Sequence, residues 1–190
     1  MQLLSPLQYP ILILIEARST LIYETTLMTN TFCSTYQITL PLAELQAEIS
    51  MPTNLATSAE ETIWREFVSF HCWQHWMPSV SQVEIDGSLD VGRGSTLLVK
   101  SRSSQTIWAI SHWSPPKRIE FVVKTRNKYL AYGFSFVIDS ARQEIILGIE
   151  GECEFRGPLR PLAPFLAWRQ KQLFCELLNR FAKHLRNNTD

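Results

Sequence analysis

The side chains that could carry metal or acid–base chemistry are few and widely spaced in this sequence. His71 and His75 are four residues apart in a predicted helix, with Cys72 between them, and such a pair can share a metal ion on one helix face. No glutamate follows in an HExxH arrangement and no further ligand set is evident, so we interpret both histidines as structural or surface residues. We therefore expect neither a metal site nor a cofactor.

His112 is the best candidate for a residue that transfers protons, although its position leaves open which face of a strand it takes. Glu120 alternates with apolar neighbours in one predicted strand, and Glu150, Glu152 and Glu154 do so in another. Side chains alternate across a strand, so these carboxylates should face solvent and not a bound substrate. No serine or cysteine nucleophile with an adjacent base is evident. The sequence thus leaves catalytic residues unassigned.

Aromatic residues are frequent, with six tryptophans among 190 residues. Such side chains line apolar pockets, but they also fill ordinary cores, and the sequence leaves both interpretations open. The candidate ligand-binding residues are the aromatic and aliphatic side chains Trp73, Trp76, Trp108, Tyr132, Phe134, Phe136, Phe174 and Leu177.

Strands and helices predicted from the hydrophobic pattern must position these residues. Helical spacing of apolar residues begins at Ser58, where a capping box with Glu61 predicts a helix start, and a short second helix ends at Trp76-Met77-Pro78. A long final helix is predicted over residues 163–186. The predicted strands are residues 42–52, 80–89, 95–102, 105–114, 117–125, 129–139 and 142–155. Short connections between strands indicate an antiparallel meander, with the long helix packed on one face in an α+β fold.

The order of elements over residues 40–186 resembles the START-like (SRPBCC, polyketide cyclase/dehydrase) superfamily. The matching motifs are residues 58–64 in the first helix, Trp76-Met77-Pro78, Gly151 in the last strand and Gly157-Pro158 before the last helix. The resemblance implies a helix-grip fold, in which a curved antiparallel sheet of about seven strands wraps around a long C-terminal helix. Two short helices follow the first strand in that fold, and a cavity holds a hydrophobic ligand.

This resemblance sets the expected domain organisation and function. Residues 1–38 fall outside it and are predicted to be an N-terminal extension, whose structure the sequence does not define, and residues 39–190 are predicted to form a START-like ligand-binding domain. The implied function is to bind a hydrophobic small molecule, such as a lipid, quinone or polyketide-like compound, between the sheet and the C-terminal helix. The alternative is a polyketide cyclase/dehydrase-type enzyme that uses a polar cavity residue as acid or base.

Charge and cysteine usage limit the expected partners and location. The 18 basic and 18 acidic residues cancel, so we expect no nucleic-acid partner. The apolar run at residues 11–15 is too short to span a membrane. Four cysteines without a CxxC pair favour reduced thiols in a cytoplasmic protein. A transient membrane contact stays open because of the basic residues Lys124, Arg126, Lys128, Arg156, Arg160 and Arg169.

Overall fold

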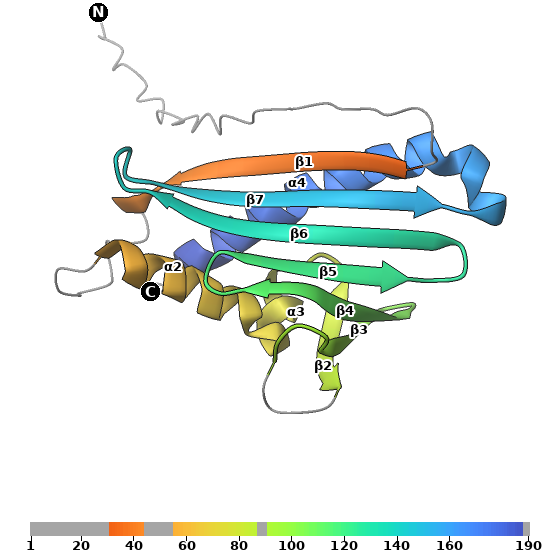
Figure 1. Cartoon of the computed structure of the whole chain (residues 1–190), viewed down its shortest axis with the longest axis horizontal. Helices are drawn as coiled ribbons and strands as arrows, with labels where there is room; N and C mark the ends of the chain where they lie inside the picture. Colours follow the sequence, from red (N-terminus) through yellow and green to blue (C-terminus); the bar gives the residue numbers. More distant parts are fainter. Residues whose placement is uncertain (1–30, 44–54, 87–90, 188–190) are drawn as a thin grey trace, which may run out of the picture.

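A seven-stranded antiparallel sheet is the largest element of the computed structural model, which describes residues 31–43, 55–86 and 91–187 (Figure 1). The strands are β1 (Thr31–Pro41), β2 (Val80–Asp86), β3 (Thr96–Ser101), β4 (Gln105–Ser114), β5 (Arg118–Lys124), β6 (Lys128–Asp139) and β7 (Glu144–Phe155). Their order in the sheet is β1-β7-β6-β5-β4-β3-β2. Strands β2 to β7 therefore form the predicted meander, and β1 adds an edge strand by pairing with β7.

Helices lie against one face of this sheet. They are α2 (Leu55–Val68), η1 (Phe70–Cys72), α3 (Trp73–Trp76), η2 (Gly157–Leu162) and α4 (Ala163–Asn187). In Figure 1, α4 passes behind the sheet, and it contacts β1, β7 and α3. This is the predicted helix-grip fold, with a long C-terminal helix and short helices after the first strand. No helix in the described ranges is both long enough and apolar enough to cross a membrane.

The first strand lies earlier in the chain than the sequence predicted. The prediction placed it at residues 42–52, of which 44–52 lie outside the described residues. The structure instead has β1 at Thr31–Pro41, paired along its whole length with β7. Its aromatic and β-branched residues suit a strand, and Ile38 and Leu40 are buried on its inner face. The predicted boundary at residue 38 therefore falls inside β1, and residues 31–38 belong to the sheet.

The first helix also begins earlier than predicted, at Leu55 instead of Ser58. One side chain of this helix, Phe67, lies at the centre of an aromatic cluster. Its ring centroid lies 4.7 to 5.7 Å from those of Trp73, Trp76, Phe134, Phe136 and Phe181. The indole N–H of Trp73 also donates a 2.7 Å hydrogen bond to the carbonyl of Phe67. This aromatic cluster joins α2, α3, α4 and β6, so that end of the fold is filled with side chains.

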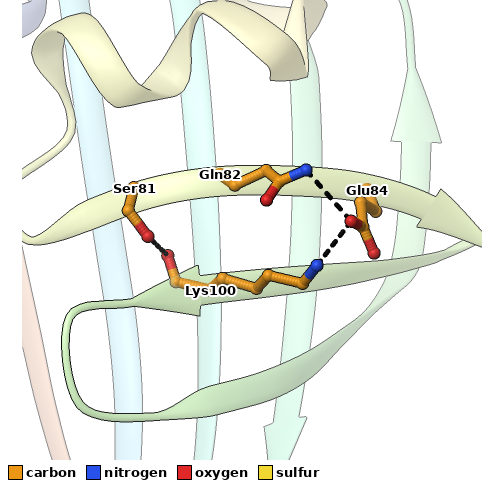
Figure 2. A network of polar contacts seen from close by, with 4 residues as sticks. All are labelled: Ser81, Gln82, Glu84 and Lys100. Carbon is orange, nitrogen blue, oxygen red and sulfur yellow. Dashed lines mark hydrogen bonds and ion pairs between the residues drawn. The ribbon is translucent and has the colours of Figure 1, made fainter.

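Polar contacts attach the edge strand β2 to β3 (Figure 2). The ammonium group of Lys100 lies 2.5 Å from a carboxylate oxygen of Glu84, which also accepts a 3.0 Å hydrogen bond from Gln82. The hydroxyl of Ser81 donates to the carbonyl of Lys100 at 3.1 Å. Most side chains of β2 are exposed, and charged residues on an edge strand disfavour pairing with a second sheet. This edge is therefore polar, and the apolar side chains gather on the helix-covered face.

Candidate ligand-binding site

A pocket of about 300 Å³ lies between the sheet and α4. Strand β6 contributes Leu130, Tyr132 and Phe134, which share one face because side chains alternate along a strand. Parts of β3, β4 and β7 and the turn after α3 complete the sheet side of the wall. Across from them, α4 contributes Leu173, Phe174, Leu177 and Gln170 at helical spacing. The wall is therefore mainly apolar, with a few polar groups.

Gly151 explains how α4 approaches the sheet so closely at one edge of this pocket. A Cβ atom added at Gly151 would lie only 2.3 Å from Cζ of Phe174. The Phe174 ring occupies the space opposite this small residue and is itself 2% exposed. Phe174 also lines the pocket, together with Leu130 and Leu173.

Five of the eight candidate ligand-binding residues line the pocket, namely Trp108, Tyr132, Phe134, Phe174 and Leu177. The other three, Trp73, Trp76 and Phe136, do not line it. They are at most 2% exposed and pack in the aromatic cluster around Phe67. Residue type alone could not separate the two groups, because aromatic side chains suit a pocket wall and a core equally well.

The sequence prediction missed the polar residues of the wall, of which Lys128 and Gln170 are the most distinctive. Both had a detectable signal. Lys128 has the same strand parity as Leu130, Tyr132 and Phe134, and Gln170 lies one helical turn before Phe174. Periodicity therefore identifies the pocket-facing positions even where the side chain is polar.

Tyr132 is the buried polar group of this pocket. Its side chain is 7% exposed, and burial raises the pKa of its hydroxyl well above the usual range. A hydrogen bond with the side chain of Gln170 opposes part of that rise in pKa. The phenol is therefore protonated at neutral pH and can donate a hydrogen bond into the pocket.

The acid–base candidates lie elsewhere. His112 is exposed on β4, and Glu120 and Glu150 share the guanidinium of Arg118 on the outer face of the sheet. The N–H group of Arg118 lies 2.8 Å from Glu120. Neither His112 nor the glutamates of β5 and β7 line the pocket, as strand parity predicted for the glutamates.

The histidine pair at the second helix makes no ligand cluster in the structure. His71 and His75 are both exposed. Within the described ranges, no three His, Cys, Asp or Glu side chains are placed to hold a metal ion together. The four cysteines are free thiols, and Cys153 is the buried one.

Residues 46–186 match the family model described as polyketide cyclase / dehydrase and lipid transport. The chain belongs to this family. The match includes α2, all the strands from β2 to β7 and nearly all of α4, but it begins after β1. Every residue of the pocket wall named above lies within it.

Solved structures share the fold at low sequence identity. A START superfamily protein from Mycobacterium smegmatis is 18% identical, with a TM-score of 0.53, and the alignment covers 83% of this chain and 96% of that one. The di-domain ARO/CYC StfQ from the steffimycin biosynthetic pathway is 8% identical, with a TM-score of 0.58, over 82% of this chain and 50% of that one. No curated protein sequence matches the chain. These similarities establish a START-like fold.

Proposed function

We propose that this protein binds a hydrophobic small molecule in the pocket between the sheet and α4. The observation that carries the proposal is the wall itself, in which Trp108, Tyr132, Phe134, Phe174 and Leu177 surround about 300 Å³. Ligand sites of this kind are mostly apolar with a few polar groups that orient the ligand. Family membership supports the same function, since the matched family is described by polyketide chemistry and lipid transport.

Ligand uptake tests this proposal directly. The purified protein is incubated with a panel of fatty acids, fatty alcohols, quinones and fused-ring aromatic compounds, and complexes are detected by native mass spectrometry. We expect a 1:1 complex with at least one of these classes. Failure to take up any compound of the panel would count against the proposal.

A second candidate function is catalysis of the cyclase or dehydrase type, which the pairing of Tyr132 with Gln170 inside the pocket favours. A phenol with a raised pKa stays protonated and can donate a hydrogen bond, but it is a weaker acid and does not abstract a proton near neutral pH. No described His, Asp or Glu lines the pocket to act as the base. Binding is therefore the better supported function. Turnover of a bound polyketide-like substrate that Tyr132→Phe abolishes, with ligand affinity unchanged, would favour the enzyme.

Transient membrane contact is also part of the proposal, and an exposed apolar patch supports it. Phe165 and Trp168 are 56% and 57% exposed, and their ring centroids lie 5.9 Å apart near the start of α4. Leu162, just before the helix, is 54% exposed, and Arg169 is exposed beside the pair. Aromatic residues next to basic ones suit the headgroup region of a bilayer. We expect this patch, formed by Leu162, Phe165 and Trp168, to touch the membrane.

A further inference from the structure

A second hollow of about 360 Å³ lies next to the pocket, beside the first half of α4. The two spaces share four lining residues, Lys128, Leu130, Gln170 and Leu173, so they adjoin each other. Among the described residues that line either space, the charged ones are Lys128 and Arg169, and both are cationic. The apolar pocket thus adjoins a region in which Lys128 and Arg169 supply positive charge only, and we call this region the mouth.

Neither of these two cations is engaged by a carboxylate in the described part of the chain. The ion pairs found there involve other basic residues. Glu154 lines an outer depression together with Lys128, but Arg156 binds the carboxylate of Glu154 at 2.8 Å. Lys128 and Arg169 can therefore bind an anion that the described residues do not supply.

Several other polar groups of the wall already have partners. The hydroxyls of Ser101 and Ser104 lie 2.8 Å apart, within hydrogen-bonding distance of each other. Thr106 accepts a 3.1 Å hydrogen bond from the indole N–H of Trp108. With Tyr132 and Gln170 also joined, the two cations are the polar groups best placed to select a ligand.

We infer that the ligand is an anionic amphiphile, whose apolar body fills the pocket and whose carboxylate is held at the mouth by Lys128 and Arg169. This inference rests on the proposed function and adds the chemical class of the ligand. A guanidinium can bind a carboxylate through two parallel hydrogen bonds, and an ammonium adds a point charge. The body is either a chain or a fused ring, and the experiment distinguishes the two.

The experiment compares each carboxylic acid with a neutral partner that has the same body. Dodecanoate is paired with dodecanol, and anthracene-2-carboxylate with its methyl ester, and affinities are measured by calorimetry below the concentration at which the ligands aggregate. We expect the acid of one pair to bind about tenfold more tightly than its neutral partner. The preference should shrink as salt is added, because the mouth is partly exposed to solvent.

The double variant Lys128→Gln, Arg169→Gln should lose this tenfold preference and keep the affinity for the neutral partner. Binding of the neutral partner then shows that the variant is folded with an intact pocket. Arg126→Gln is the matched control, since Arg126 is an exposed cation of the same hairpin that lines neither space.

The possible failures separate the inference from the proposed function. If acids and neutral partners bind equally well, the inference is overturned and the proposed function stands. If the acid preference survives in the double variant, the two cations do not hold the carboxylate and the inference is likewise overturned. If neither body binds in either form, the inference and the proposed function both fail.

Discussion

Substitutions at two adjacent leucines of α4 can distinguish a ligand pocket from a filled core. Leu177 lines the pocket and is partly exposed, whereas Leu178 is 0% exposed in the core. We compare Leu177→Asp with Leu178→Asp. Both positions lie inside the same helix, so the helix-propensity penalty of about 0.5 kcal/mol is shared and cancels in the comparison.

The expected magnitudes differ because of burial. Removing a fully buried leucine side chain costs about 2 to 5 kcal/mol, and an unpaired buried carboxylate adds several more. Leu178→Asp should therefore remove most or all of a typical domain stability of about 5 to 15 kcal/mol. Leu177→Asp loses only partial burial, about 1 kcal/mol, and water in the pocket can hydrate the new carboxylate. Together with the helix-propensity penalty, this loss should lower the melting temperature of Leu177→Asp by about 3 to 6 °C. The substitution should also abolish uptake of apolar ligands.

Thermal unfolding and ligand uptake by native mass spectrometry measure these two effects. A folded Leu177→Asp variant without ligand binding, beside an insoluble Leu178→Asp variant, agrees with the pocket. Two results would refute the reasoning. An insoluble Leu177→Asp variant would mean that the position is ordinary core, and a variant that still takes up ligand would place the ligand elsewhere.

Three further changes test other parts of the structure. Gly151→Ala should push the ring of Phe174 toward the pocket, costing about 1 to 3 kcal/mol and weakening ligand binding, and unchanged calorimetric affinity would contradict that contact. Burial, followed by the nearby Cys33 thiol, raises the pKa of Cys153 from 9.0 to about 11, so the folded state favours the neutral thiol. The contribution of this thiol to the stability of the folded state is therefore fully present below pH 9 and declines as the pH rises toward 11. Cys153→Ala should remove the decline between pH 9 and 10 in urea titrations, and a decline of unchanged slope would assign it to another group. Replacing Phe165 and Trp168 by serine should reduce sedimentation with anionic vesicles without changing the melting temperature, and equal sedimentation would exclude the patch as the membrane contact.

Strong alternation made the central strands predictable from the sequence. The predicted strand at residues 142–155 is β7 to within two residues, because its apolar and acidic side chains fall on opposite faces. Strand β1 was missed because its position depends on pairing with β7, more than 100 residues away in the chain. The apolar residues of 31–41 alternate as in a strand, but so do those of 42–52, and local pattern does not choose between them.

The site was only partly predictable, for reasons that lie in packing. Phe134 lines the pocket and Phe136 fills the core, although they share one face of β6. Both rings pack against Phe67, but Phe136 also packs against Trp64 of α2 and Phe181 of α4. The strand face taken by His112 could not be predicted for a different reason. The ladder between β4 and β5 shifts register between Ile110 and His112, so strand parity cannot be carried across that point.

The burial of α4 changes along its length, and this explains why core, pocket and mouth follow one another. After Ala163, none of its residues is fully buried until Phe174, whereas Leu178, Phe181 and Leu185 all are. The second half of the helix therefore packs into the core, the middle forms the pocket wall, and the first half borders the charged hollow and carries the exposed aromatic pair. Substitutions toward the C-terminal end should thus act mainly on stability. Those toward the N-terminal end should leave stability unchanged and act on which ligand enters and where the protein meets a membrane.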